Sequence, residues 1–192
     1  RRAQAVRLLA RIPAVGVDDL RPFLELPSTE DTLIVEAAVA GLALLDLPAE
    51  ALPILMEFID GDRARVAMYA LPRCANLMVP QEMLNVLREL LSRERLKITV
   101  RKEAIRLLGG LGATESTTIL AGAWKAGQTF HHRDVRIAYG HAARQQLHRE
   151  EYWGILSDIA ADEEAAVARS VLNMKVADCP GEVARRRYVN LM

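Results

Sequence analysis

The sequence has few aromatic residues, few cysteines and no long apolar run. Aromatic side chains make up 5% of the 192 residues, although 51% of the chain is hydrophobic. A β-sandwich would need more tyrosine, threonine and alternating valine, so this composition favours close-packed helices. No stretch approaches the run of about eighteen apolar residues that indicates a membrane-spanning helix, and we expect no membrane partner.

Cysteine is too sparse and too widely spaced for a disulfide framework or a zinc site. Cys74 and Cys179 are the only two, and neither belongs to a CxxC motif or a histidine-rich cluster. This pattern is typical of a reducing compartment, so we expect a cytoplasmic protein. His141 and His148 are seven residues apart, about two turns of a helix, too far to share one ion as an i, i+4 pair does. We therefore expect no metal.

Motifs of catalysis and of nucleotide binding are also missing. No serine or cysteine stands in a recognisable nucleophile-and-base arrangement, and no glycine-rich phosphate loop follows a strand. The letters GGLG at 109–112 indicate the end of a helix rather than a nucleotide cradle. We expect no cofactor and no catalytic residue, which points to a non-catalytic protein.

Charge is distributed unevenly along a chain whose formal net charge is zero. Residues 14–62 contain eleven acids and one arginine, whereas residues 93–149 contain eleven bases and four acids. The basic half permits binding to an acidic partner, and the opposite signs of the two halves permit head-to-tail self-association.

An internal repeat is the strongest signal in the sequence. Its marker is a valine within an amphipathic segment, recurring at intervals of 31, 34, 35 and 32 residues at Val35, Val66, Val100, Val135 and Val167. A second amphipathic segment precedes each marker, with a leucine in a comparable place at Leu24, Leu55, Leu87, Leu120 and Leu156. One helix pair cannot bury its apolar stripe alone, so the repeat predicts stacked helical hairpins.

The markers and their neighbours resemble the HEAT repeat. The pattern acid, Val-Arg, Ala, Leu-Leu is clearest around Val100 and Val135, and a proline recurs inside the first helix at Pro22 and Pro53. The resemblance implies an all-α superhelix (solenoid) of about five to six hairpins forming a single domain over residues 1–192. Both ends fall within a repeat, so we expect the chain to be part of a longer one.

In HEAT-like stacks the second helices line the inner, concave surface. By helical angle, the core-facing residues of the segment 98–111 are Val100, Ala104, Leu107, Leu108 and Leu111. The opposite positions of the second helices define what we call the basic face: Lys102, Arg106, His141, Arg144, His148, Arg169 and Arg7. This face would bind an acidic protein or peptide, or a phosphate backbone, unless it is only a solvated polar surface.

One arginine position has a structural interpretation. Arg101 and Arg136 directly follow a marker valine. In HEAT-like repeats such an arginine commonly bonds an acid in the inter-helix turn of a neighbouring unit, which forms a ladder. The candidate acids in those turns are Glu30, Asp60 or Asp62, and Asp162.

The HEAT resemblance leaves function open. HEAT proteins serve as scaffolds, transport receptors, DNA glycosylases and lyase subunits that attach bilins, and no residue here specifically supports a lyase. Trp124 and Trp153 could stack on bases as in the glycosylases, with Trp153 and Asp158 as an aromatic and carboxylate pair for base excision. Tryptophans on first helices are more often packing residues, and net neutrality disfavours duplex binding. We expect a scaffold for an acidic protein partner, with nucleic-acid binding as the alternative.

Overall fold

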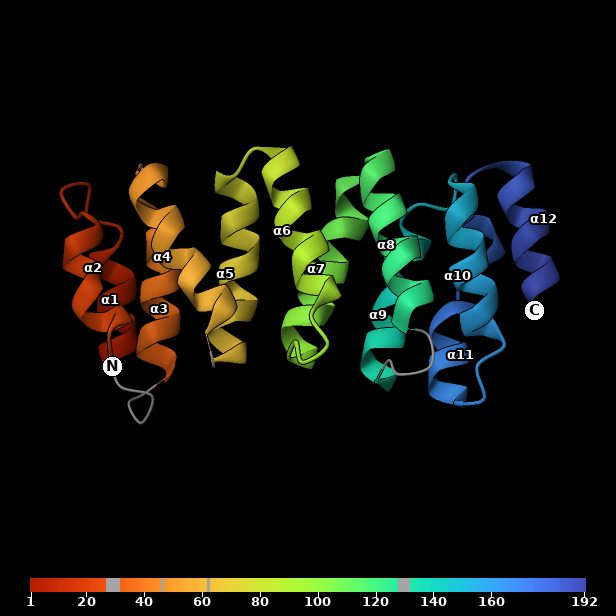
Figure 1. The fold of residues 1–192 in the computed structure, drawn as a ribbon, viewed down its shortest axis with the longest axis horizontal. Helices are drawn as coiled ribbons and strands as arrows, with labels where there is room; N and C mark the ends of the chain where they lie inside the picture. Colours follow the sequence, from red (N-terminus) through yellow and green to blue (C-terminus); the bar gives the residue numbers. More distant parts are fainter. Residues whose placement is uncertain (27–31, 46, 62, 128–131) are drawn as a thin grey trace. The chain divides into compact units, whose positions relative to one another are not determined.

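The computed structural model describes residues 1–26, 32–45, 47–61, 63–127 and 132–192, shown as a ribbon in Figure 1. These residues form twelve α-helices and one 3₁₀ helix, and no β-strand occurs among them. The all-α class expected from composition and periodicity is confirmed. No helix in these ranges has both the length and the apolarity needed to cross a membrane.

The chain divides into two compact units, Arg1–Met83 and Leu84–Met192, each with its own packing. In the first unit α3 packs against α1, α2 and α5, and α4 packs against α5. The bounds of these helices are α1 Arg2–Leu9, α2 Val17–Leu24, α3 Thr32–Leu42, α4 Pro48–Asp60 and α5 Ala64–Leu77. The boundary between the units falls within α6, Pro80–Ser92.

The second unit contains the base-rich part of the chain. Its helices are α7 Ile98–Leu111, α8 Thr114–Gly127, α9 Arg133–Arg144, α10 Glu150–Ala160, α11 Ala165–Leu172, the 3₁₀ helix η1 Val176–Asp178 and α12 Gly181–Leu191. α9 packs between α7 and α11, and α10 packs against α8 and α12. The consecutive helices α7 and α8, α9 and α10, and α10 and α11 also pack together. Helices α7, α9 and α11 thus form one row of neighbours, and α8, α10 and α12 another.

The repeat positions occupy the core. The five marker valines are 0–2% exposed, and the five matching leucines are 0–7% exposed. The helical phase inferred from the repeat is therefore confirmed at these positions.

The core-facing side of α7 was predicted incorrectly in part. Val100, Ala104 and Leu108 are buried as expected, but Leu111 is 39% exposed, and Ile105 is buried although it was not expected to be. Gly109 is also buried, because α9 approaches α7 closely at that point. α7 contacts both α8 and α9, and its buried side faces α9. The hydrophobic pattern of a single helix cannot show which neighbours it will contact.

Candidate functional site

Most of the basic face lies on the row of helices α7, α9 and α11 in the second unit. Lys102 and Arg106 belong to α7, His141 and Arg144 to α9, and Arg169 to α11. Arg7 lies on α1 of the first unit and is exposed. His148 was placed incorrectly on the same helical face as His141: α9 ends at Arg144, and His148 falls in the following turn, where Gln145 and Gln146 donate to carbonyls only three residues back.

Three of these side chains come together at one place. Partial desolvation, followed by the positive charges of Arg144 and Lys102, holds the pKa of His141 below its usual value. His141 and Arg144, but not Lys102, line a cavity of about 410 Å³ together with Gln145, Leu147, Met174 and Asp178. We call Lys102, His141 and Arg144 the basic cluster, and two acids lie near it, Asp134 beside Lys102 and Asp178 in the cavity lining.

In the rest of the basic face, Arg106 has a carboxylate partner on its own helix, whereas Arg169 bonds a neutral carbonyl. Arg106 bonds Glu103 on its own helix, with Nε 2.9 Å from Oε2, and this hydrogen bond raises the pKa of Arg106 above its usual value. Arg169 donates to the carbonyl of Ala165 in the preceding turn. Arg106 therefore adds little net charge to the surface, because the carboxylate of Glu103 on the same helix offsets its positive charge.

Members of the basic cluster also have intramolecular partners, but weaker ones. The Nζ of Lys102 lies 3.8 Å from Oδ2 of Asp134, a long contact between half-exposed groups. Arg144 donates from Nη1 to the carbonyl of Ser170 at 3.0 Å. A carbonyl is uncharged, so Arg144 keeps its full charge while its side chain is held in place.

The arginine ladder has one rung of the expected kind. Arg136 on α9 pairs with Asp162 in the turn before α11, Nε to Oδ2 at 3.2 Å, and with Glu164 at 2.6 Å. Asp162 also accepts from the backbone N–H of Glu164, which fixes the turn. Asp62, the candidate acid of another rung, lies outside the described residues.

Arg101 does not bond an acid in a neighbouring turn, so this part of the ladder prediction is wrong. Its guanidinium donates to the carbonyls of Leu91, at 3.0 Å, and of Arg93, at the end of α6. The last carbonyls of a helix have no partner within the helix, so an arginine in reach can satisfy them and also interact favourably with the helix dipole.

A rung of reversed charge occurs in the first unit, and sequence reasoning missed it. Glu36 directly follows the marker Val35, as Arg136 follows Val135, and it is buried on α3. Arg65, in the first turn of α5, places Nε 2.9 Å from Oε1 of Glu36. The sequence signal was an acid in the position that elsewhere holds arginine.

Both tryptophans are engaged within the second unit. Trp124 is 3% exposed, meets Tyr139 edge-on with ring centroids 5.2 Å apart, and donates from Nε1 to Oδ2 of Asp158 at 2.8 Å. Trp153 donates to the carbonyl of Leu147. Asp158 thus bonds Trp124 from a neighbouring helix, whereas the sequence had suggested a pair with Trp153.

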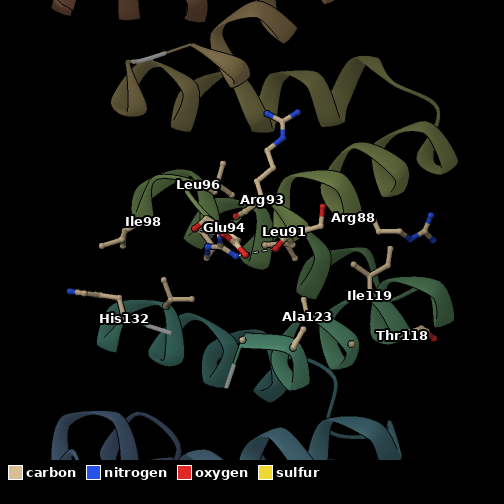
Figure 2. A pocket seen from close by; sticks show the side chains of 16 residues that line it. Arg88, Leu91, Arg93, Glu94, Leu96, Ile98, Thr118, Ile119, Ala123 and His132 are labelled. Atoms are coloured by element: carbon tan, nitrogen blue, oxygen red, sulfur yellow. Dashed lines mark hydrogen bonds between the residues drawn. The ribbon is translucent and has the colours of Figure 1, made fainter. Parts of the chain in front are cut away.

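A second cavity, of about 980 Å³, lies between the end of α6, the α6–α7 turn, α8 and the start of α9. Figure 2 shows Leu91 facing Ala123 across it. Sequence reasoning did not identify this cavity, and its only signal was the small residues Gly122, Ala123, Ala126 and Gly127 on one side of α8. The remaining lining residues are Arg88, Leu91, Ser92, Arg93, Glu94, Leu96, Ile98, Arg101, Thr118, Ile119, His132 and Val135.

The described residues offer little to covalent or metal chemistry. Burial raises the pKa of the Cys74 thiol to about 12, so this thiol stays neutral and enclosed. Within the same part of the chain, no group of three or more His, Cys, Asp or Glu side chains is placed to hold a metal ion.

No protein-family model matches the chain, and no curated protein matches it significantly.

Proposed function

We propose that the chain is a stack of HEAT-like helical hairpins that acts as a non-catalytic scaffold and binds an acidic protein or peptide. The observation that supports this binding site most directly is the convergence of Lys102, His141 and Arg144 from two neighbouring helices beside a cavity. The partner's carboxylates would meet this cluster, and the helices would hold it in place.

The stacking part of the proposal is supported by burial and by helix neighbours. Marker valines and matching leucines at the repeat interval all face the core. The second helices α7, α9 and α11 pack in chain order, as do α3 and α5 in the first unit. A repeat protein whose hairpins contact mainly their neighbours has this pattern of packing.

The acidic chemistry of the partner follows from the state of the cluster. Desolvation by burial, followed by the nearby charges of Arg144 and Lys102, lowers the pKa of His141, so adding a proton there costs free energy in the free protein. A bound carboxylate would relieve that repulsion and form charge-assisted hydrogen bonds with Lys102 and Arg144. The cluster therefore favours an anion over a neutral or cationic ligand.

We expect fluorescein-labelled octaglutamate to bind the protein and octalysine not to bind. Introducing negative charge into the cluster with Lys102→Glu and His141→Glu should weaken octaglutamate binding by about tenfold or more, because carboxylates would then face like charge. Arg144 is left unchanged, since its guanidinium also bonds the carbonyl of Ser170. Fluorescence anisotropy at low ionic strength measures each affinity.

The matched control reverses two exposed bases away from the cluster, Arg95→Glu in the α6–α7 turn and Lys125→Glu on α8. This control changes the net charge of the protein at least as much as the cluster variant does, yet its octaglutamate affinity should stay within about twofold of wild type. Equal weakening by both double variants would reject a local site. Tighter binding of oligodeoxythymidylate than octaglutamate, with a steep salt dependence, would favour the nucleic-acid alternative.

Octaglutamate affinity should also increase as the pH falls from about 7.5 to about 5.5, a range in which glutamate stays ionised. In the free protein the pKa of His141 is lowered, so the ring is neutral at neutral pH. A bound carboxylate raises that pKa, so binding takes up a proton and strengthens as pH falls through the bound-state pKa. His141→Gln should flatten this profile, and a profile unchanged by His141→Gln would exclude the histidine from the site.

A further inference from the structure

The cavity between α6, α8 and the start of α9 is formed by residues outside the basic cluster. Its volume of about 980 Å³ is within the range of roughly 300–1,000 Å³ that is typical of small-molecule sites. α8 packs against α7 and α10, and side-chain bonds join α6 to its neighbours: Arg88 pairs with Glu115 on α8, and Arg101 on α7 donates to the carbonyl of Leu91. The cavity is thus a space between helices of one unit that their own side chains do not fill.

The walls of this cavity are mostly apolar. One wall is a face of α8 on which Ile119 is followed by small residues at Gly122, Ala123, Ala126 and Gly127. A side chain added at Gly122 would meet no heavy atom within 4 Å, so the space beside that helix is open. The opposite wall includes Leu91, Leu96 and Ile98, and Ile98 is 39% exposed. An apolar wall left open in this way can bury an aliphatic ligand.

The described lining contains three arginines and one carboxylate, that of Glu94, and Arg101 is the arginine with no carboxylate among its bonded partners. Arg88 pairs with Glu115, and Arg93 pairs with Glu89 at 2.7 Å. Figure 2 shows the Arg93 side chain extending away from the α8 wall. Arg101 also lines the cavity, and the groups to which it donates are carbonyl oxygens, which leave its positive charge in place.

We propose that this cavity binds an aliphatic carboxylate, with its chain along the small-residue face of α8 and its carboxylate at the Arg101 end. Burial of the chain would supply most of the affinity, and the positive charge of Arg101 would select an anionic head group. The same arginine joins the α7 side of the cavity to the end of α6, so a ligand bound there would also stabilise that turn.

Isothermal titration with dodecanoate tests the proposal. Wild type should bind dodecanoate, and it should bind dodecyltrimethylammonium, which has the same chain and a cationic head, about tenfold more weakly. Gly122→Leu should weaken dodecanoate binding by about tenfold or more, because the new side chain occupies the cavity. Ala126→Leu fills the same space from the next turn of α8 and should act in the same way.

The matched control is Gly154→Leu on α10. Gly154 is also a helical glycine with no heavy atom within 4 Å of an added Cβ, and it does not line this cavity. All three substitutions should leave the helical circular dichroism spectrum intact, and Gly154→Leu should bind dodecanoate as wild type does. Unchanged binding in both Gly122→Leu and Ala126→Leu would overturn the site, and equal affinity for the cationic detergent would overturn the choice of a carboxylate.

Discussion

Replacing Gly109 by alanine should destabilise the second unit by about 1–3 kcal/mol, although alanine is the better helix former. An added Cβ at Gly109 would lie 2.7 Å from the Cβ of Ala142 and 2.9 Å from its Cα. Neither atom can move by a change of rotamer, so α7 and α9 would have to separate. These helices carry the basic cluster, so octaglutamate affinity should fall as well.

Gly110→Ala is the control for that substitution. Gly110 is the next residue of α7, is exposed, and has no heavy atom within 4 Å of an added Cβ. The same chemical change should therefore stabilise the protein by up to about 1 kcal/mol through helix propensity. Urea denaturation followed by circular dichroism would measure both variants. If both glycines tolerate alanine equally, the close approach of α7 and α9 is not a constraint in solution.

The class of fold and much of the core could be predicted from the sequence because they depend on periodicity. A valine at each repeat interval and a leucine in each preceding segment are enough to fix which side of a helix is buried, and these positions are buried. The rotation of α7 could not be predicted in this way. It depends on Gly109 meeting Ala142 across a helix pair, and such a contact requires knowing which helices are neighbours.

The partners of charged side chains were harder to predict than burial. Arg101 and Arg136 occupy the same place in the repeat, yet Arg136 bonds acids and Arg101 bonds carbonyls. A long guanidinium bonds whichever acceptor the adjacent turn offers, and these turns differ from one repeat to the next. Prediction of the basic face was limited for the same reason: the sequence identified the cations but could not show that Glu103 compensates Arg106.

The cavity could not be predicted because it follows from the spacing between helices. Small residues on α8 usually indicate close packing of a neighbouring helix, which would leave no space. Here the same residues line a cavity that also borders the end of α6. The sequence supplies the side chains of such a site, but the distance between its walls is a property of the fold.

Replacing Trp124 by alanine should destabilise the second unit by about 3–5 kcal/mol, the largest effect we expect from one side chain. The substitution removes a buried ring that contacts Tyr139, and it removes the hydrogen bond to Asp158. Trp124→Phe keeps most of the apolar volume and should cost only about 1 kcal/mol, mainly for the lost hydrogen bond. Urea denaturation of the three proteins gives this order directly.

Trp153 provides the comparison that separates packing from a role in binding. It is half-buried, and Arg187 lies 5.9 Å from its ring centroid, so Trp153→Ala should cost less than half as much as Trp124→Ala. Because the chain has two tryptophans, Trp153→Phe leaves Trp124 as the only indole fluorophore, and its emission should be that of a buried ring. If Trp124→Phe instead left stability unchanged and abolished binding of oligodeoxythymidylate, the ring would be a base-stacking surface. The hydrogen bond to Asp158 and the edge contact with Tyr139 argue for the packing role, because both hold the indole within the unit.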